Sequence, residues 1–519
     1  MTMPDDATPA TVPEVVVQAS RRHPDAVAID DGDSCVTFAQ LQNLCSRMAA
    51  AFLAYGLCKG ERVAVWAPNI PEWIVVAVGA QSARGILVPL NTRLKGKEAG
   101  DILRRSRARL LFTVGEFLGI RYPELLDRES LPALERVIIL SGASGSHETL
   151  DQFVARGASI SVSMVTAAGE HVGPDDVADI LFTSGTTGEP KGVMSTHGQN
   201  TWTFEAWSVA VGLRSDDRYL IVNPFFHTFG YKAGWLACLL RGATIIPARV
   251  FDAGTIMRRV VEERVSVLPG PPALFQSMLA HESCGRIDLG SLRLAITGAA
   301  NVPPVLVERM RTVLGFQSVL TGYGLTEAPV VTICRHGDSD ARVALSCGAP
   351  LPGVEVKCVA DDGHSVGPGE SGEVVVRGPC VMRGYFDDPQ ATARAIDADG
   401  WLHTEDIGAL DADGYLHITD RKKDLFICGG FNCYPAEIEK IMSTHSAIAQ
   451  VAVIGVPDER LGEVGKAFVV LRPDATCDIA SLTSWCRDNM ANYKVPRQIV
   501  WVDALPTTAS GKVQKFVLR

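Results

Sequence analysis

Hydroxyl-bearing residues and glycines are concentrated just after a short apolar run, in residues 180–193, which read ILFTSGTTGEPKGV. The polar part consists of Thr183, Ser184, Gly185, Thr186, Thr187 and Gly188, and Lys191 adds a positive charge. Hydroxyls and backbone N–H groups suit phosphate oxygens, and glycine lets the backbone approach them closely. The spacing differs from a Walker A loop, because Pro190 precedes the lysine and no Gly-Lys-Ser/Thr opens a helix. The stretch therefore predicts a phosphate-binding loop, with a solvated turn as the alternative interpretation.

Further segments carry residue types that handle phosphate, ribose or a metal ion. In chain order they are YGLTE (323–327), HTEDIG (403–408), TDRKKDLFICGGFNCYPAEIE (419–439) and PTTASGK (506–512). Taken singly, each has an ordinary explanation: Asp406 as a turn acid, Glu327 as an acid in the first turn of a helix, and Lys512 as a solvated charge. It is their order along the chain that predicts a function.

Together with the phosphate-binding loop, these segments stand in the order found in adenylate-forming enzymes, and the chain resembles that superfamily over essentially its whole length. The superfamily includes acyl-CoA synthetases, the adenylation domains of nonribosomal peptide synthetases, and luciferases. The resemblance implies an AMP-forming acid–thiol ligase that uses ATP, Mg²⁺ and coenzyme A. A carboxylate attacks the α-phosphate of ATP, pyrophosphate leaves, and a thiol then displaces AMP. Both steps need dispersed anionic charge to be balanced by metal, lysine and oriented amides.

The resemblance also implies roles for individual residues. The 183–192 loop closes on the β- and γ-phosphates, Thr326 meets the α-phosphate, and Glu327 helps to hold Mg²⁺, as a hard carboxylate should. Lys512 reaches the substrate carboxylate and the α-phosphate in the first step. The catalytic candidates are Lys512, Glu327, Thr326 and His227. The further nucleotide candidates are Gly298, Ala299 and Ala300 in the adenine pocket, Tyr323 against the adenine, and Asp406 with Arg421 at the ribose.

A two-domain organisation follows from the same resemblance. Residues 1–422 would form the adenylate, and a small mobile domain over 423–519 would swing about a hinge at Lys423. The swing withdraws Lys512 and brings the loop between the two cysteines of CGGFNC (428–433) to the site. Gly429 and Gly430 would then leave room for the pantetheine arm of CoA, the alternative being a simple tight turn. Lys494 is expected at the surface.

The stretch NPFFHTFGYKAGWLACLLRG (223–242) carries the expectations about the acyl group. It has no acidic residue to hold a substrate amine, and its aromatic side chains suit a broad apolar pocket, although at least half of them are expected in the core. His227 is interpreted either as a pocket-gating ring or as a satisfied core histidine, and Lys232 either as a contact to a substrate oxygen or as an exposed side chain. The acyl-pocket candidates are Phe226, His227, Tyr231, Trp235 and Gly298.

Within the superfamily, residues 223–234, 267–275 and 460–470 look most similar to actinobacterial CoA ligases for polycyclic steroid- or terpenoid-derived propanoates. Two residues depart from the family pattern. Glu405 stands where the family usually has Gly before the ribose aspartate, and Trp235 stands where close relatives carry a smaller aliphatic side chain. A carboxylate beside the nucleotide should repel phosphate.

These departures leave alternatives open. One is a specialised ligase that has weak or lost adenylation and mainly transfers a supplied acyl adenylate to CoA. From other classes, a luciferase-like oxygenase would consume O₂ without CoA, and a non-catalytic nucleotide sensor would release no pyrophosphate. The intact Lys512 argues against the sensor, because sensing needs no mobile catalytic lysine.

The segments between the motifs must build the scaffold that positions them. Near the N-terminus, apolar runs alternate with helical patterns, which predicts parallel βαβ units. The expected strands there are 62–68, 85–90 and 108–114, and the expected helices are 38–55, 71–84 and 97–107. After about residue 345, short strands such as 372–378 and a turn at Asp413-Gly414 predict a small β-barrel-like part.

The tail predicts a compact α+β unit. Its expected strands are 449–456, 466–471 and 498–502, with helices from 435 and near 480–490. The expected fold is therefore α/β, with a large N-terminal domain of parallel and mixed sheets with helices, and a small mobile α+β C-terminal domain.

Composition sets the outer limits. The chain has 519 residues, 47% of them hydrophobic and 21% charged, which fits a globular protein of two or three units. A formal charge of −10 argues against a general nucleic-acid or membrane binder. The 13 cysteines are scattered, and no signal peptide or membrane span is apparent, so a cytoplasmic location is expected. The expected partners are a small carboxylic acid or acyl adenylate and CoA, with a homodimer and a separate upstream adenylating enzyme as further candidates.

Overall fold

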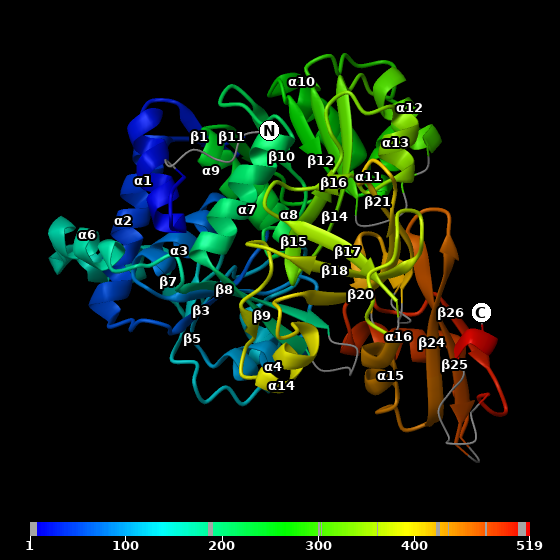
Figure 1. Cartoon of the computed structure of the whole chain (residues 1–519). Helices are drawn as coiled ribbons and strands as arrows, with labels where there is room; N and C mark the ends of the chain where they lie inside the picture. Colours follow the sequence, from blue (N-terminus) through cyan, green and yellow to red (C-terminus); the bar gives the residue numbers. More distant parts are fainter. Residues whose placement is uncertain are drawn as a thin grey trace.

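The computed structural model describes residues 8–184, 190–298, 302, 304–360, 362–421, 426–433, 435–472, 475–506 and 515–518. These residues form four sheets, three in a large N-terminal domain and one in a small C-terminal domain (Figure 1). Within the described part, no helix is long and apolar enough to cross a bilayer.

The first large sheet has eight strands in the order β19-β9-β8-β4-β3-β5-β6-β7. Strands β4, β3, β5 and β6 are mutually parallel, as the alternation of apolar runs and helices predicts, while β8 and β9 form an antiparallel hairpin at the phosphate-binding motif. The strand bounds are β3 Arg62–Trp66, β4 Ile86–Pro89, β5 Ala108–Thr113, β6 Arg136–Ile139, β7 Glu148–Thr149, β8 Val177–Ser184, β9 Pro190–Thr196 and β19 Gly384–Tyr385.

Helices accompany this sheet at the positions that the sequence predicts. Thr37 caps the second helix in a capping box with Gln40, because its hydroxyl accepts from the Gln40 N–H while the Gln40 amide accepts from the Thr37 N–H. The helices of this part are α1 Val12–Arg22, α2 Phe38–Tyr55, α3 Pro71–Ser82, α4 Gly96–Ser106, α5 Leu150–Ala155 and α6 Val162–Glu170, with short 3₁₀ turns at Pro123–Leu126 and Arg156–Ser159.

The second large sheet has nine strands in the order β16-β15-β14-β13-β12-β10-β11-β1-β2 and is mostly parallel in its centre. Its strands are β1 Val27–Asp30, β2 Cys35–Thr37, β10 Arg218–Ile221, β11 Thr244–Pro247, β12 Val267–Pro269, β13 Leu294–Gly298, β14 Ser318–Leu325, β15 Ala328–Ile333 and β16 Ala349–Pro350. Its helices are α7 His197–Ala210, α8 Thr228–Gly230, a π-helix Tyr231–Leu236, α9 Ala237–Arg241, α10 Ala253–Glu262, α11 Pro272–Ala280, α12 Pro304–Thr312 and α13 Asp340–Leu345.

A smaller antiparallel sheet, in the order β17-β18-β20-β21, stands where the sequence predicts a barrel-like part. Its strands are β17 Glu355–Val359, β18 Gly372–Arg377, β20 Leu402–Leu410 and β21 Leu416–Arg421, and α14 Pro389–Ala395 precedes β20. The predicted Asp413-Gly414 turn joins β20 to β21, with Gly414 at a φ of +79°.

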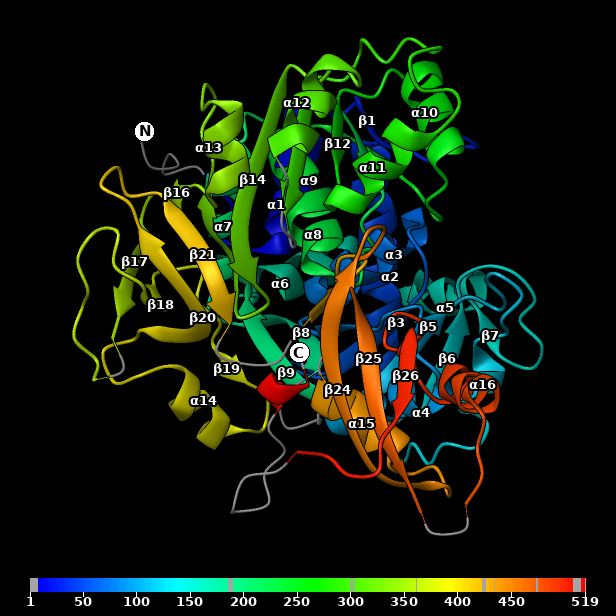
Figure 2. The same cartoon turned by 90° about the vertical axis from the view of Figure 1, so that its right-hand side faces the viewer.

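The C-terminal domain is built on a five-stranded sheet in the order β23-β22-β25-β24, with β26 paired to β25 (Figure 2, orange to red). Its elements are β22 Phe426–Cys428, β23 Phe431–Cys433, α15 Pro435–Met442, β24 Ile448–Asp458, β25 Gly462–Leu471, α16 Ile479–Asn489 and β26 Gln498–Trp501, followed by a 3₁₀ turn at Lys515–Val517. The three strands and two helices predicted for the tail are confirmed, whereas β22 and β23 were not predicted.

Among the described residues, the buried hydrophobic side chains form one cluster in the large domain and two in the small one. The larger core runs from Val12 to Leu416, and the main core of the C-terminal domain runs from Phe426 to Ile499. The expected boundary between 422 and 423, and the expected hinge Lys423, fall within residues 422–425, outside the described part.

Candidate active site

The phosphate-binding motif forms the end of the β8–β9 hairpin. Thr183 lies opposite Lys191 and Ser184 opposite Pro190 in the antiparallel register. The strand therefore continues two residues beyond Phe182, where the sequence predicts a loop. Gly185, Thr186, Thr187 and Gly188 lie outside the described residues, so their expected contact with phosphate stays a prediction.

Glu327 lies in an enclosed polar cluster with Lys191 and Tyr385. The Tyr385 hydroxyl donates to Glu327 Oε1 at 2.8 Å, and Lys191 Nζ lies 4.9 Å from the centre of the Tyr385 ring. Burial raises the pKa of the Glu327 carboxyl, whereas the Tyr385 hydrogen bond and the Lys191 charge oppose that rise. The structure thus brings together two residues that the sequence singles out and one, Tyr385, that it does not.

Tyr323 and Asp406, predicted for adenine and ribose, are directly bonded to each other. The Tyr323 hydroxyl donates to Asp406 Oδ2 at 2.6 Å, and the Asp406 N–H donates to the Thr404 hydroxyl at 3.2 Å. Asp406 is only 7% exposed, and β20 places it opposite Arg421 of β21. The side chain of Arg421 lies outside the described part, so its contact with ribose stays a prediction.

Glu405 has a backbone conformation that favours glycine. Its φ is +62°, in the left-handed region where a Cβ is disfavoured. The residue lies where the β18–β20 register shifts between Glu373 and Val375, and its N–H donates to Glu373 Oε1 at 3.1 Å. The expected clash of the Glu405 carboxylate with the nucleotide is therefore not the only reason for glycine at this position.

Gly298 lies at the end of β13, directly opposite Gly322 of β14. A Cβ added at Gly298 would lie 3.0 Å from the Gly322 carbonyl oxygen, which is closer than side chains normally come. Glycine here leaves open the strand ends of the central sheet, where ligands of α/β proteins bind. Ala299 and Ala300 lie outside the described residues.

His227 has its ring exposed, and it is not the satisfied core histidine of the alternative interpretation. Its Nδ1 accepts the Phe229 N–H at 3.2 Å and caps α8, so the neutral ring carries its proton on Nε2. The surrounding protein lowers the pKa of the His227 imidazole, although solvent reaching the exposed ring tempers that shift. His227 and Phe226 both line the same cavity.

Tyr231 and Trp235 are both fully buried in the core, and the expectation that they line an open pocket is not met here. Their rings stack at 4.7 Å, and the Trp235 ring centre lies 6.0 Å from that of Trp73 on α3. The π-helix over 231–236 turns these rings inward toward α3, which periodicity alone does not predict.

Lys232 is neither exposed nor in contact with the described cavity. Its side chain is 1% exposed, and Nζ lies 2.9 Å from Asp179 Oδ1 and donates to the Ser195 hydroxyl at 2.9 Å. Burial lowers the pKa of Lys232, opposed by the Asp179 charge. The residue is a structural cation that joins the π-helix to β8 and β9.

Lys494 corrects another expectation. It is 4% exposed rather than superficial, and its ammonium group lies 2.9 Å from Glu98 Oε1 of α4 and 2.6 Å from Glu437 Oε1 of α15. The ammonium group is compensated by carboxylates from both domains, and the aliphatic part of the side chain can be buried. A sequence pattern does not reveal this arrangement.

The loop with Gly429 and Gly430 is the turn of the β22–β23 hairpin, and both glycines have positive φ, +57° and +84°. A Cβ added at Gly430 would lie 3.3 Å from Pro271 Cβ of the N-terminal domain. The hairpin therefore lies against the large domain. Cys428 and Cys433 flank the turn and are buried, with thiol–thiol contact lowering the pKa of Cys428.

A cavity of about 370 Å³ lies between the two domains and joins these parts. From the N-terminal domain it is lined by the phosphate hairpin, the His227 segment, Thr326 and one side of α4. From the C-terminal domain it is lined by α15, the β22–β23 hairpin and the segment after α16. Its lining includes Thr183, Pro190, Phe226, His227, Thr326, Glu98, Phe431, Glu437, Tyr493 and Lys494.

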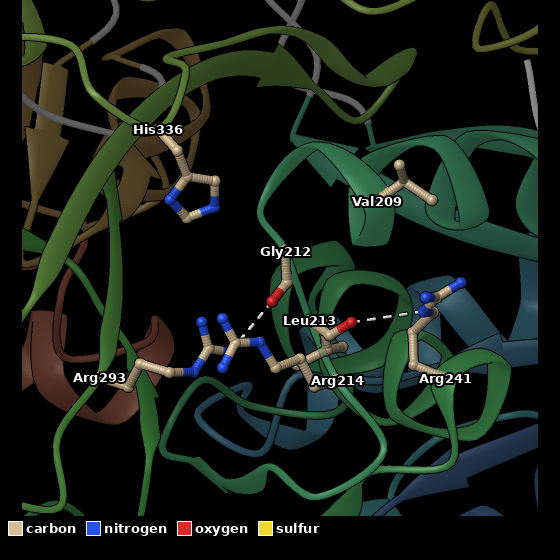
Figure 3. Close-up of a pocket in the computed structure, with 7 residues that line it drawn as sticks. All are labelled: Val209, Gly212, Leu213, Arg214, Arg241, Arg293 and His336. Carbon is tan, nitrogen blue, oxygen red and sulfur yellow. Dashed lines mark hydrogen bonds between the residues drawn. The ribbon is translucent and has the colours of Figure 1, made fainter. Parts of the chain in front are cut away.

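A second cavity, of about 330 Å³, contains none of the motif residues. Figure 3 shows two of its arginines directed at backbone carbonyls: Arg293 donates to Gly212 O at 3.0 Å and Arg241 to Leu213 O at 3.4 Å. Arg293 also pairs with Asp217, and Arg241 with Glu205. Arg241 joins α9 to α7 and to the segment after it, and Arg293, just before β13, joins the same segment just before β10, so this cavity has a structural explanation.

The sequence matches two known protein families. The family profile of AMP-binding enzymes matches residues 16–386, and that of the AMP-binding enzyme C-terminal domain matches residues 437–512. The chain belongs to the AMP-binding enzyme family. The enzymes of this family that are acyl-CoA synthetases use ATP, Mg²⁺ and CoA, and this chain is an AMP-forming acid–CoA ligase.

Similar proteins support the acyl-CoA ligase branch. The chain is 48% identical over 98% of both chains to the 3-[(3aS,4S,7aS)-7a-methyl-1,5-dioxo-octahydro-1H-inden-4-yl]propanoyl:CoA ligase of Rhodococcus jostii, and 49% identical, with the same coverage, to the Mycobacterium tuberculosis ligase of that name. The o-succinylbenzoate CoA synthetase of Bacillus subtilis, solved with a product analogue, has a TM-score of 0.81 at 28% identity and covers 97% of this chain and 98% of its own.

The residues present fit the ligands of this family. Mg²⁺ is usually held by one or two carboxylates together with substrate phosphates, and Glu327 offers a carboxylate in an enclosed site beside the phosphate hairpin. Gly298 lets β13 run close to the Gly322 carbonyl, where a Cβ would be crowded. Lys512, the predicted catalytic lysine, lies outside the described residues.

Sequence reasoning missed several residues of the site. Tyr385 bonds Glu327 across 58 residues, and Glu98, Glu437 and Tyr493 meet at the domain interface. Each is an ordinary residue in its own segment. Only Glu437 lies within one of the predicted motifs, in PAEIE, and could have been found from it.

Proposed function

We propose that this ligase converts a bulky, apolar, polycyclic propanoate of steroid or terpenoid type to its CoA thioester through an acyl adenylate. The observation that carries the proposal is the cavity of about 370 Å³, which joins the phosphate hairpin and His227 to the hairpin of Gly429 and Gly430 on the other domain. An enzyme that must present two different nucleophiles to one site needs such a junction.

The first half-reaction forms a bond between a substrate carboxylate oxygen and the α-phosphorus of ATP, and the bond to the bridging oxygen breaks as pyrophosphate leaves. Thr183, Ser184 and Lys191 would contact the leaving phosphates, and Thr326 the α-phosphate. Mg²⁺ held partly by Glu327 would neutralise developing charge. Lys512 would stabilise the pentacovalent transition state.

Two residues would orient the nucleoside. The Tyr323 hydroxyl bond to Asp406 fixes both side chains before the ligand arrives, and Asp406 would accept from the ribose hydroxyls with help from Arg421. Gly298, Ala299 and Ala300 would line the adenine pocket. Preorganised polar groups of this kind need little rearrangement during the reaction.

In the second half-reaction the CoA sulfur bonds to the acyl carbonyl carbon, the thiol proton passes to solvent, and the bond from that carbon to the AMP phosphate oxygen breaks, so that AMP leaves. The C-terminal domain would rotate about Lys423, moving Lys512 away and bringing Gly429 and Gly430 in to line the pantetheine path. The described arrangement, with Gly430 close to Pro271, supports this second orientation.

The substrate class is supported by the relatives and by the chain. Two ligases at 48% and 49% identity are named for a bicyclic dioxo-propanoyl group. The segment after His227 carries no acidic side chain that would hold a substrate amine. Phe226 and His227 lie at the cavity, where they would contact the acyl group near its carboxylate.

The setting of the enzyme is part of the proposal. ATP and CoA are substrates of the cytoplasm, and that is where we place this ligase. A homodimer is a further proposal, which sedimentation would test. An upstream enzyme that supplies the adenylate is needed only if this chain cannot form it.

The test is a pair of thioester assays read by mass spectrometry. One reaction contains a bicyclic propanoic acid, ATP, Mg²⁺ and CoA, and the other contains the pre-formed acyl adenylate and CoA. Ferulic acid is the comparison substrate, because a feruloyl-CoA synthase is 37% identical to this chain.

Thioester in both reactions, with preference for the bicyclic acid, is the expected result. Thioester from the adenylate alone would mean that adenylation is lost, and a separate enzyme would then supply the adenylate. Oxygen consumption without CoA, or nucleotide binding without pyrophosphate release, would overturn the ligase proposal in favour of an oxygenase or a sensor.

A further inference from the structure

A cluster of buried charges crosses the interface between the two domains. Lys494 lies between Glu98 of α4 and Glu437 of α15, and the three side chains are 4%, 10% and 9% exposed. Figure 2 shows α4 and α15 adjacent at the lower end of the C-terminal sheet. One positive and two negative charges thus share an environment with little water, where each depends on the others for compensation.

Glu98 is held in place by its own helix. Its Oε2 accepts the Lys95 N–H at 2.9 Å at the start of α4, which leaves Oε1 directed at Lys494. This carboxylate therefore stays in position whether or not the C-terminal domain is docked. Glu437 is held less completely, since its Oε2 is buried and has no hydrogen-bond partner among the described residues.

Neighbouring contacts depend on the same docking. Tyr493 precedes Lys494, and its hydroxyl accepts a hydrogen bond of 3.2 Å from the Asn91 amide. Phe431, from the β22–β23 hairpin, stacks on Tyr493 at 4.6 Å and on the Arg93 guanidinium at 4.4 Å. The segment over 91–98 therefore contacts the ion cluster and the hairpin of Gly429 and Gly430 together.

The two ion pairs differ in what a domain rotation would do to them. Lys494 and Glu437 belong to the same domain and would stay together. The Lys494–Glu98 contact joins different domains and exists only in the docked arrangement. Undocking would return Glu98 to water and leave Lys494 with a single carboxylate.

We propose that Lys494 is a positioning residue for the second half-reaction: by pairing with Glu98 it holds the C-terminal domain in the orientation that lines the CoA path. The inference rests on the proposed function and adds to it a named contact that favours one of two domain orientations. Lys494 touches no reacting atom. It acts through the hairpin that Tyr493 and Phe431 connect to it.

The primary variant is Glu98→Gln. A glutamine oxygen can keep the helix-start bond from Lys95 N–H, but the neutral amide cannot pair with Lys494 at the same time. The Lys494–Glu437 pair is left intact, so folding should be unaffected. Glu129→Gln is the matched control, because Glu129 pairs with Arg104 of the same helix at 2.7 Å without reaching the C-terminal domain.

Three readouts are compared. ATP–pyrophosphate exchange reports adenylation, thioester formation from supplied acyl adenylate and CoA reports the second step, and amide hydrogen exchange over residues 91–98 reports docking without any substrate. E98Q is expected to slow the second step about tenfold, because a charged hydrogen bond is lost. It should leave pyrophosphate exchange unchanged and make amide exchange in residues 91–98 faster. E129Q should behave as the parent enzyme.

A second variant, Lys494→Met, leaves two carboxylates facing each other and should slow the second step more than E98Q does. Because both variants break the same contact, the effect of E98Q should largely disappear in the K494M background. Equal loss of both half-reactions, or parental amide exchange in E98Q, would overturn the inference. A parent enzyme that makes no thioester from either starting material would instead refute the proposed function, while the amide exchange would still test the docking contact.

Discussion

Glu405 shows how a single residue can be misjudged from its charge alone. The sequence suggests electrostatic repulsion with a nucleotide, but the structure adds a backbone φ of +62° at a register shift of β20. Left-handed backbone costs a residue with a Cβ about 1 kcal/mol, which glycine avoids. Glycine would therefore suit this position for a conformational reason as well as an electrostatic one.

Replacing Glu405 with glycine should raise the free energy of unfolding by about 1 kcal/mol, because the strained φ is relieved. Thermal or urea unfolding measures the effect. Glu405→Ala is the matched control, since it removes the carboxylate but keeps the Cβ. If alanine stabilises as much as glycine does, charge rather than backbone strain is responsible.

The Tyr385–Glu327 bond predicts a pH effect on adenylation. Burial raises the pKa of Glu327, and the Tyr385 hydrogen bond opposes that rise. Tyr385→Phe should therefore raise this pKa further, because it removes a hydrogen bond that stabilises the ionised carboxylate. Because only the ionised carboxylate binds Mg²⁺, adenylation is lost as pH falls through the pKa, and the variant should lose it at a higher pH.

The pH profile of pyrophosphate exchange, at several Mg²⁺ concentrations, provides the measurement. Tyr415→Phe is the control, because Tyr415 makes a comparable hydroxyl bond to Asp338 at 2.9 Å, away from the motif residues. An unshifted acid limb in Y385F would show that Glu327 does not govern the step.

Some residues of the site follow from sequence and others do not. Thr183, Lys191, Glu327 and Asp406 belong to ordered motifs, and the structure brings them to a common region. Lys232 and Lys494 were expected to be accessible, yet both are buried. Lys232 pairs with Asp179, and Lys494 pairs with Glu437 and Glu98, all of them distant in the sequence. Such pairings depend on tertiary packing, which local patterns do not encode.

At the scale of elements, α1 and α7 are joined through a buried histidine. The Val12 N–H at the start of α1 donates to His197 Nδ1 at 3.3 Å, and His197 is 1% exposed. Burial lowers the pKa of His197 to about 4, from an ordinary value of 6.5. Protonation of Nδ1 would remove the acceptor and charge a buried ring, so the contact between the helices requires the neutral form.

The sign follows from proton binding. Between pH 6.5 and 4 the unfolded chain binds a proton at His197 that the folded chain does not. Stability is therefore lost as pH falls through this window, by about 2 kcal/mol between pH 8 and pH 5 from this residue alone.

His197→Gln should remove that part of the pH dependence, because an amide oxygen can accept the Val12 N–H without titrating. Urea unfolding at pH 8 and pH 5 measures it. His364→Gln, at a histidine that is 65% exposed, should keep the parental dependence. A parental slope in H197Q would show that the ring is not buried in its neutral form.

The elements themselves were predicted well where periodicity is strong. Helix 38–55 with its Thr37 cap and the strands of the tail agree with α2, β24, β25 and β26. The β8–β9 hairpin and the π-helix over 231–236 were not predicted, because a motif rich in glycine and hydroxyls looks like a loop and a π-helix has no distinct sequence period.

At the scale of the whole molecule, the main cores of the two domains are separate, and the domains meet through polar contacts. The N-terminal and C-terminal cores share no residues, and the contacts between them include the Lys494–Glu98 pair, the Asn91–Tyr493 bond and the Arg93–Phe431 stack. Polar interfaces between domains with separate cores permit rotation, whereas a continuous apolar core would prevent it. A ligase that serves two half-reactions at one site needs this property.

The position of Gly430 gives a whole-molecule prediction. Its φ is +84°, and a Cβ would lie 3.3 Å from Pro271 across the domain interface. Gly430→Leu should therefore prevent close docking and slow thioester formation from supplied acyl adenylate roughly hundredfold, because misplacement by about 1 Å has effects of that size. Adenylation should continue, since that step does not need this docking.

Gly414→Leu separates docking from backbone strain. Gly414 has a φ of +79° in the β20–β21 turn, and a Cβ there would meet no described atom within 4 Å. Both variants carry similar strain, but only Gly430 faces the other domain. Pyrophosphate exchange and thioester formation, measured side by side, should be lost selectively in G430L and spared in G414L. If G430L loses neither step, the hairpin does not line the CoA path; if both variants lose both steps, strain and not docking explains the result.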